Sequence, residues 1–561
     1  MNLIKGQETP YRFWKKYELG KDYLDKKNLV GRTQKCWDFY AGDQWKHVES
    51  DGEYLPMLNF IEKIIDFKVS TISQNSMAAH FSDLEAREEL APVYELFDRK
   101  FASDWEKADM DTNLWSFADD AAVTGDGILY FPTGDIRDVQ LLGNTSVLYG
   151  DESQKKIQKQ PYVIIHGRET VISLREEARQ NGIPEDQVMQ ITADTDTMYV
   201  VGNKSEVSED RNIDTAKATF IIYMEKRNGV VFSCKCTQKA FIAPFEPICS
   251  RDFAGNAVNS MSLYPIVKMN WKDFPNSARG RGEVEHLIPN QVEYNLTLVR
   301  LSLTIRMTSY ARFVYDPNMV INPEALTKVG VPIEVMSGGV NSIDDIIRYV
   351  QPAQSNGEAR SYAETLLDNT QELSGAGETA TGNINPSRVA ATALIAIRDQ
   401  AALPLNQQQA KLKTAVEDLA KVWMEIEMVY HPEGFEVVTE EEVPVLDENG
   451  EPVVDMYGQA QTEKKKVLKK VTKADMDMLK PEIRIDVSPD NPWTVEARQN
   501  FADNLFNTGK INLRQYARIS PKGSIVPTEE IYKICDEQDA EQARLQMQSQ
   551  LPPPIDDEIE D

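Results

Sequence analysis

The sequence predicts an α+β protein in which helical and β-rich segments follow one another along the chain, and three patterns lead to this class. Up to about residue 125 the pattern is mostly helical, and NFIEKIIDFKVSTISQN (59–75) places Phe60, Ile64, Phe67 and Ile72 near one stripe that we expect in a core. From 127 to about 270, short β-branched and aromatic runs indicate strands, and Asn228-Gly229 between two of them predicts a hairpin. Long helical patterns return from about 280.

The composition of the 561 residues limits the classes of function that this protein can have. Hydrophobic residues make up 41% of the chain, which is enough for several packed cores. The net charge of −28 argues against tight wrapping of nucleic acid, because duplex binding is driven largely by Lys and Arg that displace counterions. The five Cys, expected as free thiols, and the five His lack the spacing of metal or redox sites, so we predict no metal site and no cofactor. We also predict no signal peptide and no membrane-spanning segment.

The stretch GRGEVEHLIPNQVEYNLTLVRLSLTIRMTSY, which begins near residue 280, predicts a helix with two opposed apolar stripes. One stripe consists of Val292, Leu296, Val299, Leu303 and Met307, and the other of Tyr294, Leu298, Leu301 and Ile305. The polar strips between them hold Glu293, Thr297, Arg300 and Thr304 on one side and Asn295, Ser302 and Arg306 on the other. Two stripes fit either a helix sandwiched inside one domain or a helix flanked by neighbours in a closed ring.

Two more helices follow, with a small polar loop between them. Ser355-x-x-Glu358 has capping-box spacing and opens the first, which has Ala359, Ala363, Leu366 and Leu373 on one side. The second is expected from about 387 to 430, kinked where Pro404 removes a donor. Beyond the kink it keeps a stripe of Leu412, Val416, Leu419, Trp423, Ile426 and Tyr430. The loop between them, SGAGETATGNINPSR (374–388), has glycines at Walker A spacing, but Asn383 and Ile384 stand where that motif needs Lys and Ser or Thr.

The last part of the chain predicts a strand-rich insert and then helices. The insert, 435–490, has a turn signal at Asn449-Gly450 and a dense basic run from Lys464 to Lys473. With Glu440, Glu441 and Glu442 nearby, this run fits either a charge-paired hairpin or a DNA contact. A helical pattern extends to about Gln548, and the acidic tail LPPPIDDEIED is expected to be disordered.

The order of these elements resembles the portal proteins of tailed bacteriophages. GRGEVEHLIPNQVEYNLTLVRLSL is similar to the helix that enters a portal stem, and LSGAGETATGNINPSRVAATALIAIRDQAALPLNQQQAKLKTAVEDL to a tunnel loop and spine helix. NPWTVEARQNFADNLFNTGKINLRQYARI is similar to crown-side helices, and the helical start KKNLVGRTQKCWDFYAGDQW fits the same order. The ordered set covers most of the chain.

The resemblance implies a ring-forming portal fold with a helical stem, a small α/β clip, a mixed α/β wing with a long kinked helix, and a helical crown. It divides the chain into a wing (1–282), stem helix 1 (283–310), clip (311–355), stem helix 2 (356–373), tunnel loop (374–386), spine helix (387–431), wing β-rich insert (432–490), crown (491–548) and disordered acidic tail (549–561).

The resemblance also implies a function without catalysis. A ring of 12 subunits at one capsid vertex would let double-stranded DNA enter during packaging and leave during ejection. It would bind the terminase large subunit and then a head-completion or adaptor protein, besides the major capsid and scaffolding proteins. The protein would lie in the virion and, during assembly, in the host cytoplasm, away from membranes.

The resemblance assigns residues to the channel and to the subunit contacts. The tunnel loop would present Gly375, Gly377, Glu378, Thr379, Thr381, Gly382, Asn383 and Asn385 to DNA. Its glycines supply backbone freedom, and its acidic and neutral groups approach phosphate without holding it. The stem channel face would carry Glu293, Thr297, Arg300 and Arg306, and the two apolar stripes would pack between subunits. Arg300 and Arg306 could touch phosphate, although a salt bridge to Glu293 or to a neighbour is the simpler interpretation.

Two alternatives from other classes remain. A nucleotide-binding enzyme would need the missing lysine after Gly382 and a metal-binding acid, whereas Asp119, Asp120 and Asp126 lack a partnered His or Lys in the sequence and are interpreted as a turn before ILYF. A non-enzymatic helical adaptor or structural protein of a virion would share the amphipathic stripes but would not assemble into a ring with a central hole.

Overall fold

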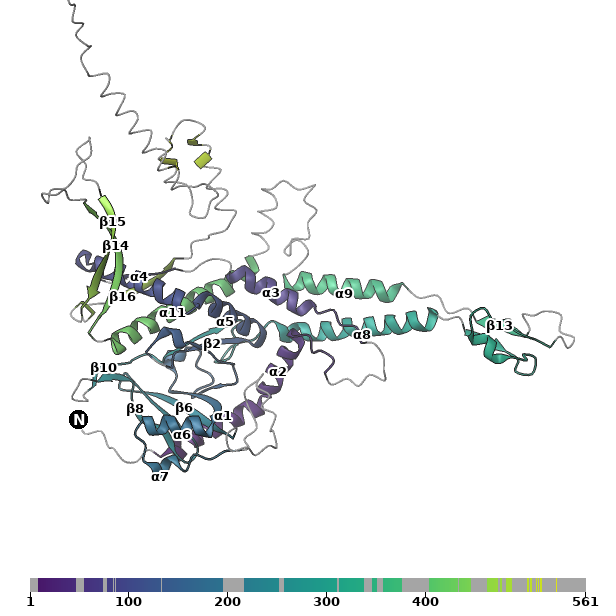
Figure 1. The fold of residues 1–561 in the computed structure, drawn as a ribbon, viewed down its shortest axis with the longest axis horizontal. Coiled ribbons are helices and arrows are strands. Elements are labelled where there is room, and N and C mark those ends of the chain that lie inside the picture. The colour runs from purple at the N-terminus through teal and green to yellow at the C-terminus, as the bar shows by residue number, and fades with distance from the viewer. Residues whose placement is uncertain are drawn as a thin grey trace, which may run out of the picture.

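The computed structural model shows a mixed α/β body from which one long arm projects (Figure 1). It describes residues 9–46; 55–194, except 74–77, 84, 86 and 133; 216–336, except 252–256, 310 and 311; 346–350; 357–375; 403–444, except 432; and 462–486, except 473, 474 and 477–480. Between 502 and 531 it describes single positions. The α+β class is confirmed within these residues.

The N-terminal part is helical, as predicted. Its helices are α1 (Pro10–Lys26), α2 (Leu29–Tyr40), α3 (Phe60–Ser73), α4 (Ala91–Lys107) and α5 (Met110–Thr124), with the short strand β1 (Ala78–Asp83) between α3 and α4. The predicted stripe of α3 enters the main core, where Phe60, Ile64 and Ile72 are buried and Phe67 is partly buried.

The largest sheet has five antiparallel strands in the order β4-β5-β6-β7-β8. They are β4 (Val147–Tyr149), β5 (Tyr162–Thr170), β6 (Lys217–Arg227), β7 (Val230–Cys236) and β8 (Phe241–Pro247). Asn228 and Gly229 both have positive φ, at 52° and 84°, which matches the tight hairpin turn that Asn-Gly predicts. The sequence pattern missed α6 (Val171–Gln180) and α7 (Glu185–Val188). One of the β-branched runs expected as a strand, TMYVVG (197–202), lies outside the described residues.

The second sheet and one long helix form the centre of the body. The sheet has the order β11-β2-β3, with β2 (Asp126–Tyr130), β3 (Gln140–Leu141) and β11 (Ile266–Asn270), and a pair of short strands, β9 (Cys249–Arg251) and β10 (Ala257–Ser260), lies apart. Helix α11 (Asn406–Tyr430) contacts this sheet, and Trp423 is fully buried against the rings of Phe97 and Phe101.

The predicted stripe of α11 is largely confirmed. Leu412, Val416, Leu419, Trp423 and Ile426 are buried, whereas Tyr430 is exposed at the end of the helix. Pro404 lies in a 3-10 turn, Leu403–Leu405, immediately before α11, so regular α-helical geometry begins after this proline. The helix expected on its other side, 387–402, lies outside the described residues.

The C-terminal insert is β-rich, as expected, and forms two separate pairings. Strands β14 (Phe435–Pro444) and β15 (Thr462–Val471) make a hairpin whose register places Glu440, Glu441 and Glu442 opposite Lys466, Lys465 and Lys464. The side chains of these six residues lie outside the described part of the structure, so the charge-paired interpretation of the basic run stays a prediction. Strand β16 (Pro481–Asp486) pairs with β1, which lies about 400 residues earlier in the chain. A pairing over that separation has no local sequence signal.

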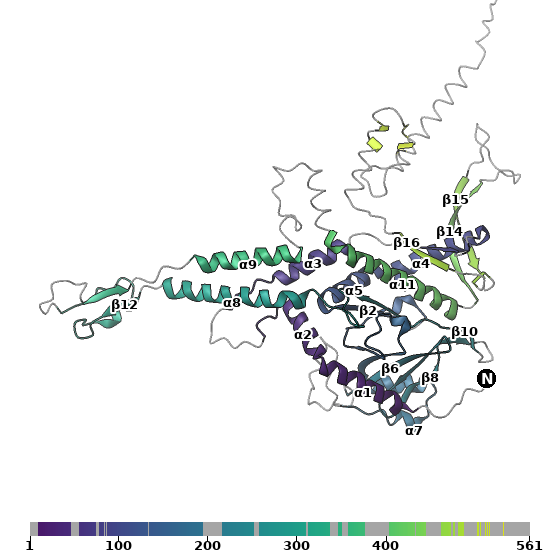
Figure 2. The same ribbon diagram turned by 180° about the vertical axis from the view of Figure 1, so that it is seen from behind.

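The arm is a hairpin of two helices with a small β structure at its tip. Helices α8 (Val284–Ser309) and α9 (Glu358–Ser374) lie side by side, and β12 (Arg312–Tyr315) pairs with β13 (Ile347–Val350) at the far end (Figures 1 and 2). Helix α9 begins at Glu358 with Gly357 as its cap residue, and Ser355 of the predicted capping box lies outside the described residues. Most of the predicted crown and all of the acidic tail lie outside the described residues.

Asp120 gives the body a testable pH dependence. Burial, and next the charge of Asp119, raise its pKa to about 7. Because the folded pKa exceeds the unfolded value near 4, ionisation of Asp120 destabilises the fold above pH 7, and this cost disappears as the pH falls toward 4. We expect Asp120→Asn to raise the free energy of unfolding at pH 8 by roughly 2 kcal/mol and at pH 4 by much less. Urea unfolding at both pH values measures the difference. Asp22→Asn, at an exposed position, is the control, and an equal gain in the control would contradict the assignment.

Candidate functional site on the α8–α9 arm

The base of the arm is fixed by one buried carboxylate. Glu283 directly precedes α8 and lies 2.6 Å from Lys68 Nζ of α3 and 2.7 Å from Lys272 Nζ, while Trp271 Nε1 donates to it at 3.2 Å. Burial by itself would raise the pKa of Glu283, but the two lysines outweigh burial and lower it to about 2. The carboxylate therefore stays charged and ties α8 to the body.

Two glycines bring the backbone of this base against the end of α5. A Cβ on Gly280 would overlap with the carbonyl oxygen of Gly125, and one on Gly282 would overlap with that of Val123. Gly125 itself ends α5 with a φ of 111°, a conformation that favours glycine. The GRG at the start of the predicted stem therefore has a packing role that the sequence alone did not reveal.

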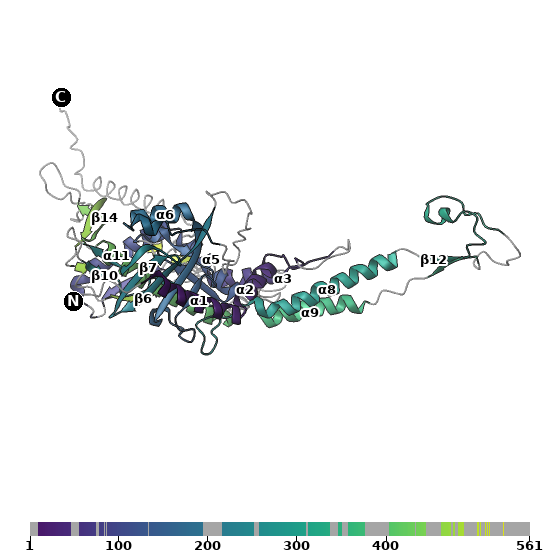
Figure 3. The ribbon, with the colours of Figure 1, turned by 90° about the horizontal axis from the view of Figure 1, so that it is seen from below.

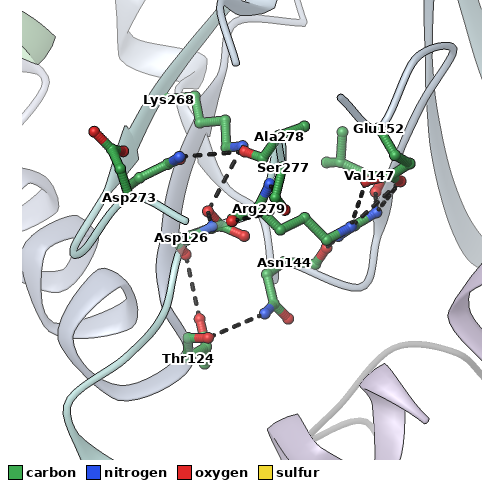
Figure 4. Close-up of polar contacts among 12 residues, drawn as sticks. Thr124, Asp126, Asn144, Val147, Glu152, Lys268, Asp273, Ser277, Ala278 and Arg279 are labelled. Carbon is green, nitrogen blue, oxygen red and sulfur yellow. Dashed lines mark hydrogen bonds and ion pairs between the residues drawn. The ribbon is translucent and has the colours of Figure 1, made fainter. Parts of the chain in front are cut away.

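A buried network joins the same base to both sheets (Figure 4). Arg279 donates to the carbonyl oxygens of Asn144 and Val147 at 2.6 and 3.0 Å and pairs with Glu152 at 3.0 Å. Close by, Lys268 Nζ lies 3.6 Å from Asp126 Oδ1 and donates to the carbonyl of Ala278. Burial lowers the pKa of Lys268, and Asp126 opposes that shift.

These contacts correct the interpretation of three acids as an unpartnered turn. Asp126 belongs to β2 and has Lys268 beside it, and Asp119 and Asp120 lie in α5. Lysine 268 is about 140 residues further along the chain, so no local motif could have indicated the pair. Among the described residues, no group of three His, Cys, Asp or Glu is placed to hold a metal ion.

One side of α8 is polar and buried against the body. Gln291 Nε2 donates to the carbonyl of Leu58 and to Asn295 Oδ1, and Asn295 Nδ2 donates to Gln44 Oε1 at 2.5 Å. Thr297 is also buried, with its hydroxyl donating to the carbonyl of Glu293 at 2.8 Å. The assignment of Thr297 to a channel face is therefore wrong, because a buried hydroxyl cannot line an open channel.

The stripe of Tyr294, Leu298, Leu301 and Ile305 is covered in part by the chain itself. With Ala363 and Leu367 of α9 these four residues line a groove between the two helices, and Leu298, Leu301 and Ile305 also line a hollow with Pro56, Met57 and Leu58. Asn290 Nδ2 donates to Thr370 Oγ1 at 3.0 Å and links the two helices near the base. Tyr294 is buried, while Ile305 near the tip stays exposed.

The other stripe has less cover. Val292 is 38% exposed, Leu303 37% and Met307 53%, whereas Leu296 and Val299 are partly buried. A single chain thus leaves large apolar side chains in water along one flank of a projecting helix. Such a flank is typical of a contact with another molecule.

The remaining predicted site residues lie on the arm or outside the described part. Arg300 Nη1 lies 3.3 Å from Glu293 Oε1, which is the ion pair that the sequence favoured, and Arg306 is exposed. Gly375 ends α9 with a φ of 76°. The other predicted tunnel-loop residues, Gly377, Glu378, Thr379, Thr381, Gly382, Asn383 and Asn385, lie outside the described residues.

Comparisons with known proteins give only remote structural similarity. Neither the protein-family models nor the curated proteins contain a match to this sequence. Among solved structures, a chain from the virion of a native gene transfer agent particle aligns over 70% of this chain and 81% of its own, at 10% identity and a TM-score of 0.33. A chain from the neck of an empty particle of that agent aligns over 84% and 88%, also at 10% identity and a TM-score of 0.33. Within the described residues, no helix is long and apolar enough to cross a membrane.

Glu283→Gln should loosen the base of the arm. The change leaves Lys68, whose side chain is 6% exposed, without its carboxylate, and we expect the free energy of unfolding at pH 7 to fall by about 3–5 kcal/mol. The folded pKa of Glu283 is about 2, below the unfolded value near 4.3, so its stabilisation is present above pH 4.3 and is lost as the pH falls through 2. Denaturant unfolding of both proteins at pH 7 and pH 3 measures this change. Glu293→Gln, in an exposed pair, is the control and should cost under about 1 kcal/mol. A similar loss in both variants would contradict the role of Glu283.

Proposed function

We propose that this chain is the portal protein of a phage-like head: it forms a ring of about twelve subunits at one capsid vertex and conducts double-stranded DNA during packaging and ejection. The proposal follows from the order of segments in the sequence and, above all, from the flank of α8 that a single chain leaves uncovered. The arm would be the stem, its tip the clip and the body the wing. The function is mechanical and needs no catalytic residue.

The two apolar flanks of α8 carry the assembly step. One flank faces α9 and residues 56–58 of the same chain, while Val292, Leu303 and Met307 are exposed on the other. A contact between different flanks of identical subunits is head-to-tail, and repetition of such a contact closes a ring when the rotation allows it. Full burial of a Val, Leu or Met side chain contributes about 1.5–3 kcal/mol, so three such residues per contact supply a substantial driving force.

Charge supports the conduit. A channel must let DNA slide, and each lysine that neutralises a phosphate strengthens binding and slows movement. The chain has a net charge of −28, and on the arm Arg300 is paired with Glu293, which reduces its attraction for phosphate. We assign Glu293, Arg300 and Arg306 to the channel face and the tunnel-loop residues around Glu378 to its narrowest part.

The surface at the tip of the arm is consistent with binding of protein partners. Large apolar side chains are exposed there in a short stretch of chain: Val314, Ile321, Val329, Val331, Ile333 and Met336. A concentration of this kind marks a surface for other proteins. In the proposed function these partners are the terminase large subunit during packaging and a head-completion or adaptor protein afterwards, with the capsid and scaffolding proteins around the ring.

Ring formation tests the proposal. We expect the purified protein to form rings with a central hole in negative-stain micrographs and to have a mass of many subunits by light scattering. Leu303→Asp combined with Met307→Asp should leave folded monomers, because two carboxylates would be placed in the apolar contact. Met189→Asp is the control, since Met189 is equally exposed but lies at the end of α7 on the body.

Two results would refute the proposal. One is a wild-type monomer or dimer at every salt and protein concentration, which would favour the alternative of a helical adaptor. The other is ring formation by the double variant, provided that circular dichroism shows both variants to be folded.

The tunnel loop has its own test. Gly377→Val combined with Gly382→Val should reduce DNA packaging while rings still form, because valine restricts the backbone where the loop has to adapt to a moving duplex. The measurement is the amount of nuclease-protected DNA in particles. Gly357→Val serves as the control, because this glycine has φ −61° and open space around its Cβ position. Unchanged packaging in the double variant would remove the loop from the channel.

A further inference from the structure

The first two helices concentrate positive charge on an otherwise acidic chain. Residues 10–35 contain eight Lys and Arg against three Asp and Glu, whereas the whole chain has a net charge of −28. Such a local reversal of sign attracts polyanions within the screening length of about 8 Å at physiological salt, even when the distant charge is opposite. Figure 3 shows these helices on the surface of the body, with α2 leading to the base of the arm.

Helix α1 presents three of these cations, Arg12, Lys15 and Lys26, on one exposed face. Its other face packs Phe13, Trp14, Tyr17 and Leu24 into the core beneath the large sheet. At about 100° per residue, Arg12, Lys15 and Lys26 fall within an arc of roughly 60° on the opposite side. All three are exposed, and the described part of the chain places no carboxylate in an ion pair with any of them.

A cleft continues this basic face at the turn between α1 and α2. It is lined by Lys27, which follows α1, by Arg32 of α2, and by Arg279 and Arg281 from the segment before α8. Glu285 is its one acidic lining residue and is shared, since it lies 2.7 Å from Arg32 and 3.8 Å from Arg281. The cleft therefore keeps a net positive charge. We name Arg12, Lys15, Lys26 and the cations of this cleft the basic ridge.

We propose that the basic ridge binds the sugar–phosphate backbone of duplex DNA, outside the proposed channel and without reading its base sequence. From Arg12 to Lys26, α1 rises by about 21 Å, which is comparable with six base pairs of duplex. Unpaired cations spread over such a length match a polyanion, because neutralised phosphates supply most non-specific affinity.

An acidic protein fits the ridge less well. The core of a protein interface is about 65% non-polar by area. This face of α1 has one large aliphatic side chain among its cations, the exposed Leu19, so it lacks an apolar core. The binding needs one folded chain and does not depend on ring formation.

Fluorescence anisotropy with a labelled duplex of about 20 base pairs, between about 50 and 200 mM salt, tests the ridge. The full chain should bind with an affinity that falls steeply with salt. The triple variant Arg12→Gln, Lys15→Gln and Lys26→Gln should show a salt slope shallower by roughly two to three, because each lost phosphate contact releases about one counterion fewer.

The control removes the same charge from paired cations elsewhere. Arg99→Gln, Arg179→Gln and Lys421→Gln each lose an exposed pairing, with Glu95, Glu185 and Asp418 respectively, and should keep the wild-type slope. An equal loss in this control would overturn the proposal, and so would the absence of DNA binding by the wild type at the lowest salt.

Two more outcomes distinguish DNA binding by the ridge from DNA binding in the channel and from binding of an acidic protein. The double variant Leu303→Asp and Met307→Asp should be a monomer whose DNA affinity keeps the same dependence on salt. If that dependence is lost together with the ring, DNA binds in the channel and the ridge proposal is overturned. A polyglutamate peptide that binds more tightly than DNA at equal charge, and less tightly to Leu19→Ser, would assign the face to an acidic protein instead.

Discussion

The contact of the buried carboxylate of Glu283 with Lys68 and Lys272 is the constraint on which the arm depends. A helix that leaves the body has no core around most of its length, so its direction is fixed at its root. There the carboxylate of Glu283 meets two lysines and the indole of Trp271, and Gly280 and Gly282 bring the backbone against the end of α5. Removing one partner would leave a buried charge without its counter-charge, which is strongly destabilising. The base of the arm is therefore held in one geometry and does not act as a hinge.

The root also connects the arm to the sheets behind it. Arg279 binds two carbonyl groups beside β4 and the carboxylate of Glu152, while Lys268 and Asp126 pair across neighbouring strands. Cations and carboxylates are equal in number here, so burial costs less than it would for a lone charge. A force on the arm would thereby be passed to the whole body, as the proposed ring would require of each subunit.

Charge and apolar surface are segregated outside the core. Exposed apolar residues lie along one flank of α8 and at the tip, and the cations of the basic ridge lie along α1 and the cleft beside it. The apolar surfaces are suited to contacts with other copies of this chain or with other proteins, and the cations are suited to phosphate groups. In the proposed ring these surfaces would have separate roles, with apolar contacts for assembly and the basic ridge for DNA outside the channel.

The sequence by itself determined the elements whose signal is local. Hydrophobic periodicity predicted the helices of the N-terminal part, the two helices of the arm and the buried stripe of α11, and Asn228-Gly229 predicted a hairpin. These predictions held because period and turn chemistry act over a few residues. Tertiary structure decided how distant segments contact one another: β16 pairs with β1, Lys268 lies beside Asp126, Thr297 is buried, and one flank of α8 is covered more than the other. Burial and pairing at such separations depend on the packing of the whole chain, which no local pattern contains.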